Sequence, residues 1–373
     1  MYLGQAVQRS TMNPPTKKGS ERKKNRRLNR LLKADAVMVP MSQHGFGATS
    51  LHEALVLPLL TDNETAFLGL WARLGEHFDG QWDEGALAAG VVQAQDPRGR
   101  WWLVRENECH LWRAAYETNF KRVLQKHKVD LEHATELAAF IERLLEQGDQ
   151  DHSALRAEVA PLDMASIEPD VARKGNEQFF DVVMAALYAS FRVVRKPDSR
   201  SWDFHEWKIS KVDANASKEE GLTMLAQRYC AAYPFAQLED FAWWTKIAPG
   251  KIKRAFIDAK TQWRQQDEPQ EETFGLYMLP YRDMLSEGTR YYEKAWGLNV
   301  EPHPRAPGAL PTVILDGQVI GHWTTQNAQV VLDEDVAHLC QEEEAALHRH
   351  KEDLSQHLLF RFTDLLPVYD IYE

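Results

Sequence analysis

The sequence has few cysteines and no long apolar run. Its 373 residues contain three cysteines, too scattered for a disulfide framework or a zinc site: Cys109, Cys230 and Cys340. No segment approaches the roughly 18 apolar residues of a membrane span, and the N-terminus lacks the apolar core of a signal peptide. These absences predict a soluble, cytoplasmic protein without a structural metal, long enough for about two or three domains.

Charge is distributed unevenly along the chain. The formal net charge of -11 argues against a nucleic-acid binder, yet residues 1–33 hold ten basic residues and one acid, Glu21. We interpret this segment as a basic flexible arm that captures a phosphate backbone; the alternative is a solubilising tail. Acidic residues collect near the other end, in Glu342 to Glu344, and predict a solvated helix that points away from DNA.

The segment from Thr223 to Lys260 predicts two helices joined by a tight turn. Phe241, Trp244 and Ile247 fall on one face of the first helix, and Ala248-Pro249-Gly250 breaks it. The second helix has an apolar side and a basic side, as a recognition helix in a phosphate-lined groove requires. An ordinary helical hairpin with a solvated basic face is the alternative.

Two further segments predict a helix followed by a basic wing. Asp96-Pro97-Arg98-Gly99 is a turn between β-forming runs. In a second unit, Phe179 to Ile209, Arg195 to Arg200 is a basic turn after the apolar helix DVVMAALYASF (181–191). Wings of this kind lie along phosphates. The cations that we expect to contact DNA are Arg98, Arg100, Arg195, Lys196, Arg200, Lys251, Lys253 and Arg254.

The fold class predicted is α+β, with tandem winged-helix units and a β-rich C-terminal domain. In that last part, Asp316-Gly317 forms a hairpin turn between strands at 312–315 and 319–323. The predicted divisions are a basic arm at 1–33, a first winged-helix unit at 34–118, a helical segment with a second unit at 119–220, a third unit at 221–272, and a β-rich domain with a terminal helix at 273–373.

Three blocks in the C-terminal half carry a family resemblance. They are RYCAAYPFAQLEDFAWWTKIAPGKIKRAFIDA (228–259), YMLPYRDMLSEGTR (277–290) and VILDGQVIGHW (313–323). In this order they resemble the winged-helix DNA glycosylases of the AlkZ/YcaQ type, which remove alkylated bases and unhook crosslinked ones. The resemblance extends over most of residues 50–360. It implies a DNA glycosylase whose partner is double-stranded DNA with a modified base.

The chain departs from this family where the chemistry is expected. The family has a glutamine, one residue, then glutamine or aspartate shortly before an "ALWARL"-like helix. Here Leu68 to Leu74 matches the helix, but the preceding slot holds Leu59-Leu60-Thr61-Asp62-Asn63, without glutamine. Gln93-Ala94-Gln95 lies elsewhere in the chain, and we interpret it as a coincidence. Trp102 or its neighbour replaces the family's histidine. Asp62 and Asn63 are therefore the catalytic candidates.

A carboxylate at Asp62 suits the expected reaction. Breaking an N-glycosidic bond develops positive charge on the sugar, which a nearby carboxylate stabilises while it orients a water. Asn63 would hold the water or read the base, whereas the alternative role for this polar segment is a helix N-cap. Neither a metal nor an organic cofactor is required. Trp102, Tyr281, Asp283 and Arg290 are expected to support the site, against a purely structural role for each.

Two functions of different classes therefore remain. The first is a monofunctional DNA glycosylase that removes a bulky modified base, alkylated, crosslinked or hypermodified, and leaves an abasic site. The second is a catalytically silent DNA-binding or regulatory protein, which the missing glutamines favour. A regulator would dimerise on a palindromic operator, and the sequence has no pairing helix, so we favour a monomeric, nucleoid-associated enzyme.

Overall fold

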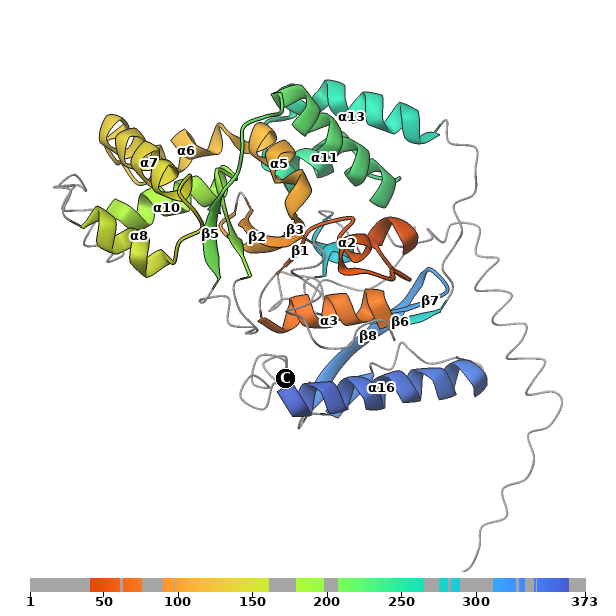
Figure 1. Cartoon of the computed structure of the whole chain (residues 1–373). Helices are drawn as coiled ribbons and strands as arrows, with labels where there is room; N and C mark the ends of the chain where they lie inside the picture. Colours follow the sequence, from red (N-terminus) through yellow and green to blue (C-terminus); the bar gives the residue numbers. More distant parts are fainter. Residues whose placement is uncertain are drawn as a thin grey trace, which may run out of the picture.

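The computed structural model combines helices with two antiparallel sheets (Figure 1). It describes residues 41–60, 63–75, 90–96, 98–160, 179–197, 207–264, 275–280, 283–288, 311–326, 329–332, 339 and 341–361. All strand pairs within these ranges are antiparallel, which confirms the predicted α+β class. The predicted arm at 1–33 lies outside the described residues.

The first sheet has five strands in the order β1-β3-β2-β4-β5. These strands are β1 (Leu59–Leu60), β2 (Val91–Gln95), β3 (Trp101–Arg105), β4 (Val193–Lys196) and β5 (Lys208–Lys211). Both predicted wing hairpins are present as strand pairs, β2 with β3 and β4 with β5. Gln93 of β2 also pairs with Arg195 of β4, so the two hairpins form a single sheet. The tandem winged-helix arrangement itself stays a prediction.

This sheet separates two apolar cores, because successive side chains of a strand point to opposite faces. Val193 belongs to one buried cluster and Val194 to the other. The helices on the first face are α5 (Cys109–Tyr116), α11 (Lys218–Ala232), α12 (Leu238–Thr245) and α13 (Pro249–Arg264). Those of the second are α6 (Asn119–Lys126), α7 (Leu131–Leu145), α8 (His152–Val159) and α10 (Phe179–Ala189). Figure 1 shows the two groups on either side of the strands.

The predicted helical pair is present as α12 and α13. Ser217 and Glu220 form a capping box ahead of α11, and Pro249 occupies the first turn of α13, where its missing N–H costs nothing. The prediction extended the first helix to Ile247, but α12 ends at Thr245. Lys246 is left-handed, with φ 56°, so the helix cannot continue through it.

The C-terminal part is a four-stranded sheet covered by a long helix. It consists of β6 (Leu276–Leu279), β7 (Thr312–Leu315), β8 (Gln318–Gln326), β9 (Gln329–Leu332) and α16 (Gln341–Arg361). The turn between β7 and β8 has positive φ at both Asp316 and Gly317, as the predicted hairpin requires. Leu347 and Leu354 of α16 pack in the same buried cluster as Trp323 of β8.

Helix α3 (Asn63–Leu74) connects the two sheets. Leu70 packs in the core of the five-stranded sheet, whereas Leu68 packs against the C-terminal sheet. The remaining short elements are 3-10 helices at Met41–His44 and Glu106–Glu108, α2 (Leu51–Ala54) and α14 (Met284–Glu287). One buried cluster includes residues from Phe46 to Ile314, so it crosses the predicted domain boundaries, which stay predictions. No described helix is both long and apolar enough to span a membrane.

Candidate functional site

The catalytic candidates lie at the junction between β1 and α3. Leu60, the last residue of β1, pairs with Trp102 of β3, and Asn63 is the first residue of α3. Thr61 and Asp62 lie outside the described residues, and the side chain of Asn63 is not described either. The structure therefore describes the elements on both sides of the catalytic slot, and the roles of Asp62 and Asn63 stay predictions.

A buried ion pair anchors α3. The Arg73 guanidinium donates to both carboxylate oxygens of Asp283, over 2.8 and 2.9 Å, and the two side chains are 1% and 2% exposed. Arg73 also donates to the carbonyl oxygens of His44 and Gly69. Asp283 accepts from the amide of Leu285 as the N-cap of α14. Because each charge is paired and hydrogen-bonded, this contact holds α3 against α14 in one geometry.

Asp283 was a predicted site residue. In the structure it pairs with Arg73, which lies 210 positions earlier in the sequence. Its carboxylate is committed to Arg73 and to the N-terminus of α14. This geometry supports a role in orienting α3. Its predicted neighbours Tyr281 and Arg290 lie outside the described residues.

His44 lies next to this pair. Its Nε2 is 3.1 Å from the carbonyl oxygen of Ala232, and its ring packs edge-on against Tyr233. Burial, and then the positive charge of Arg73, lowers the pKa of His44 from 6.5 to about 4. His44 is therefore neutral at pH 7. The sequence analysis missed both His44 and Arg73; the available signal was Arg73 as the one charged residue of the otherwise apolar segment LGLWARL (68–74).

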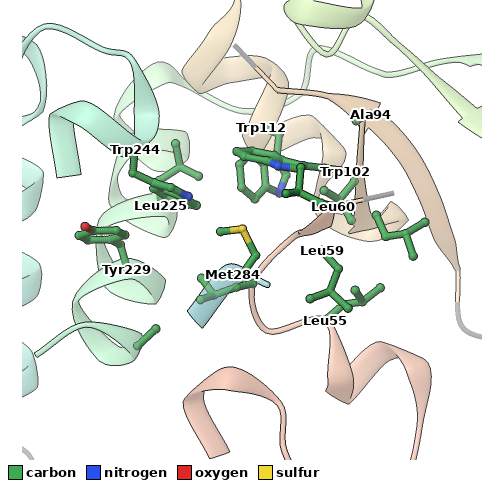
Figure 2. Packing of buried hydrophobic residues seen from close by; sticks show 14 of the residues in the cluster. Leu55, Leu59, Leu60, Ala94, Trp102, Trp112, Leu225, Tyr229, Trp244 and Met284 are labelled. Atoms are coloured by element: carbon green, nitrogen blue, oxygen red, sulfur yellow. The ribbon is translucent and has the colours of Figure 1, made fainter. Parts of the chain in front are cut away.

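Trp102 lies in an aromatic core. It is 0% exposed, stacks on Trp244 at 5.9 Å between ring centroids and meets Trp112 edge-on (Figure 2). Leu60, Trp102 and Ala94 form one row across β1, β3 and β2, so they share a face of the sheet. Among the described residues, no hydrogen-bond partner reaches the indole Nε1 of Trp102, Trp112 or Trp244. The structure thus gives Trp102 a packing role behind β1, and its predicted support of the site stays a prediction.

Gln93, one of the two glutamines set aside in the sequence, is buried in the middle of β2. It pairs with Leu103 and with Arg195, and it points to the face opposite Ala94 and Trp102. That second face packs against α10 and its neighbours, because Trp101 and Val193 belong to their cluster. Gln93 is therefore on the other side of the sheet from the row that ends at Leu60.

The wing cations make contacts inside the protein. Asp96, fully buried, accepts from the amides of Arg98 and Arg100 and from Nε of Arg100. Arg98 donates to the carbonyl oxygen of Trp243, over 2.8 Å, and lies on that ring at 4.4 Å. The buried aspartate thus fixes both arginines on one turn, where their side chains remain 19% and 16% exposed.

The second wing has a similar arrangement. Arg195 lies over the rings of Trp101 and Tyr188, at 3.9 and 5.4 Å, and Lys196 pairs with Glu106 at 2.6 Å. Lys196 is 33% exposed. Arg200 lies outside the described residues. DNA contact by this wing stays a prediction.

The cations of α13 face solvent. Lys251, Lys253 and Arg254 are exposed, whereas Ile252 and Phe256 are buried beneath them. Arg254 makes a 3.8 Å contact with Asp258. This amphipathic division leaves the basic side of the helix available to an anionic partner, as a recognition helix requires.

The described residues contain no group of three or more histidines, cysteines, aspartates or glutamates that could hold a metal ion. The chemistry predicted for the β1–α3 junction is that of the Asp62 carboxylate and the Asn63 amide, and this assignment stays a prediction. Such groups stabilise a cationic transition state and orient water.

Comparison with known proteins defines the class. The family model described as DNA glycosylase AlkZ-like matches residues 53–357. The solved structure of Streptomyces sahachiroi DNA glycosylase AlkZ has the same fold, with a TM-score of 0.62 and 15% sequence identity, over 84% of this chain and 94% of that chain. No curated protein sequence matches the chain.

The family match covers most of the sequence, including α3, the helical pair and both sheets. The protein belongs to the AlkZ-like DNA glycosylase family, and it is a DNA glycosylase. This confirms the resemblance and the enzyme class predicted from the sequence, with DNA as the partner. It also decides against the silent regulatory protein.

Proposed function

We propose that the protein hydrolyses the N-glycosidic bond of a bulky modified base in double-stranded DNA and leaves an abasic site. The base is alkylated or crosslinked, as the family resemblance implies, or hypermodified. The observation that carries this proposal is the anchoring of α3 by Arg73 and Asp283, since the first residue of that helix directly follows Asp62. A catalytic group needs rigid support of this kind to hold its geometry.

Asp62 supplies the charge in this proposal. As the bond breaks, the sugar gains oxocarbenium-like positive charge, and an ionised carboxylate beside C1′ stabilises it. The same carboxylate orients the attacking water, with the Asn63 amide as a second hydrogen-bonding group. A position that precedes a helix favours the charged form of the carboxylate, because the helix N-terminus carries partial positive charge.

The surrounding cations supply the binding energy for base extrusion. Flipping a nucleotide out of the duplex costs a few kcal/mol of stacking and pairing. Contacts from the exposed cations of α13, from both wings and from the basic arm would offset this cost, and they carry no sequence information. The protein would act as a monomer at the nucleoid, in the cytoplasm.

Incubation with modified duplexes tests the reaction. Duplexes carrying single alkylated, crosslinked or hypermodified bases are incubated with the full chain, treated with alkali and separated by size. We expect cleavage at the modified position in at least one duplex and none in the matched unmodified duplex. Intact strands in every case, at protein concentrations that saturate binding, would refute the proposed hydrolysis.

A further inference from the structure

Three segments far apart in the sequence bring cations together around Trp243. Arg98, on the first wing, lies over the Trp243 ring at 4.4 Å, and the Lys246 ammonium lies over the same ring at 5.2 Å. Arg122 of α6 donates to the carbonyl oxygen of Lys246, over 3.2 Å. The wing, α6 and the turn after α12 thus meet at one place.

Two of these cations, Arg122 and Lys246, have no acidic partner in the part of the chain that the structure describes, where no carboxylate lies within ion-pair distance of either. The aspartate in the cluster, Asp96, is fully buried; it accepts from the amides of Arg98 and Arg100 and pairs with the guanidinium groups of the same two arginines, so it does not pair with Arg122 or Lys246. Partial burial, and then the charges of Arg98 and Arg100, lower the pKa of Lys246. The neighbouring arginines therefore destabilise the charged form of Lys246, and a bound anion would offset this repulsion.

The backbone conformation at Lys246 is a second indication that lysine is not present there for the stability of the fold. Its φ of 56° lies in the left-handed region, at a helix C-terminus where glycine is the common residue. A lysine there accepts strain that glycine would remove. Strain held at an exposed cation is typical of a functional position.

The position of the cluster fits one partner. Lys246 precedes Pro249, the first residue of α13, by three positions, so the cluster adjoins the end of α13 that exposes Lys251 and Lys253. On the other side, Lys126 lies one helical turn beyond Arg122 on α6 and is also exposed. A chain of cations that extends across two helices fits a polymer with regularly spaced negative charges.

We propose that Arg98, Arg122 and Lys246 form a phosphate clamp, which binds the DNA backbone beside the recognition helix α13. The clamp depends on the proposed function only for its choice of DNA as the anion. Arg122 and Lys246 both lie on the surface of a protein with a net charge of -11. Their proximity makes this part of the surface locally positive, although the protein as a whole is negative.

The test compares the salt dependence of duplex binding. In the full chain, Arg122→Gln/Lys246→Gln removes two cations of the clamp, whereas the control Lys218→Gln/Arg349→Gln removes two exposed cations elsewhere. Arg349 lies on α16, at the opposite end of the molecule from α6 and α13 (Figure 1). Affinity for an unmodified duplex is measured by fluorescence anisotropy from 50 to 400 mM KCl.

Each lost phosphate contact reduces the slope of log affinity against log salt by about 0.9. We expect the clamp variant to have a slope shallower by about 1.8, which is roughly a 60-fold loss of affinity at 0.1 M salt if the curves converge at 1 M. The control should bind as the wild type does. A clamp variant with the wild-type slope would overturn the clamp and leave the proposed chemistry standing. A wild type that binds duplex through the clamp without excision would refute the chemistry alone.

Lys246→Gly provides an independent test. Glycine relieves the left-handed backbone and removes a crowded charge, so the melting temperature should rise while affinity for duplex falls. A residue with only a structural role would move the two measurements together. Unchanged affinity in Lys246→Gly would contradict the clamp.

Discussion

The buried His44 makes the stability of this protein sensitive to mild acid. Its pKa is about 4 in the folded protein and 6.5 in the unfolded chain, because burial and Arg73 oppose the charged ring. Between these values the unfolded state binds the proton and the folded state does not. Acidification from pH 7.5 to pH 5 therefore favours unfolding, and stability is recovered as the pH rises through 6.5.

The size of this effect follows from the same two values. Proton linkage at His44 alone lowers the free energy of unfolding by about 2 kcal/mol at pH 5, relative to pH 7.5, and by about 3 kcal/mol near pH 4. Other groups add their own acid dependence, so the variant His44→Gln serves as the reference; glutamine retains a donor for the carbonyl oxygen of Ala232 but cannot titrate.

Urea unfolding of both proteins at pH 7.5 and pH 5 isolates the contribution. We expect the wild type to lose about 2 kcal/mol more than His44→Gln between the two pH values. The neighbouring pair of Arg73 with Asp283 is left unsubstituted in both proteins. Equal losses in the wild type and the variant would refute the reasoning that His44 is buried in its neutral form.

Three further predictions concern packing and binding. Arg73→Leu should cost about 3–5 kcal/mol because it leaves the Asp283 carboxylate buried without its partner, and adding Asp283→Leu should recover part of that loss in chemical unfolding; strictly additive losses would contradict the ion pair. Gly221→Ala should lower the unfolding free energy by about 1–3 kcal/mol, since its Cβ would lie 2.4 Å from the carbonyl oxygen of Leu111, whereas the control Gly250→Ala meets no atom within 4 Å and should be neutral or stabilising. Deletion of residues 1–33 should make the salt dependence of duplex binding shallower for every sequence tested, and an unchanged slope would make the arm a tail alone.

Local patterns in the sequence predicted local structure well. The wing turn forms because Asp96 bonds to the amides of Arg98 and Arg100, and the Asp316-Gly317 turn supplies two positive φ values. Each of these signals lies within a few neighbouring residues. Such signals can be read without knowing what the segment packs against.

Long-range pairing could not be predicted in the same way. Nothing in the alternation of β2 and β4 indicates that Gln93 meets Arg195, because alternation defines the faces of a strand and not its partner. The Arg73–Asp283 pair joins positions 210 apart for the same reason. Wing cations that were predicted to face DNA also have partners within the protein; Arg195, for example, lies over the ring of Trp101.

The candidate site was predictable in part. The match to the family's "ALWARL" helix located α3 and the slot before it, and family membership confirms that this chain is a DNA glycosylase. The chemistry of that slot stays a prediction, since Asp62 and Asn63 are expected only to lie within one residue of the position of the family's glutamine pair. Resemblance alone therefore cannot assign the catalytic group.

The rate of base excision by Asp62→Asn, measured under single-turnover conditions beside Asp62→Ala, tests the central claim most directly. Asparagine retains the size and capping ability of aspartate but removes the charge, so we expect Asp62→Asn to bind modified duplex normally and to excise about 10²- to 10³-fold more slowly. Full excision by Asp62→Asn, with a loss of only about 1 kcal/mol of stability in Asp62→Ala, would show that Asp62 is a helix cap and contradict its catalytic role.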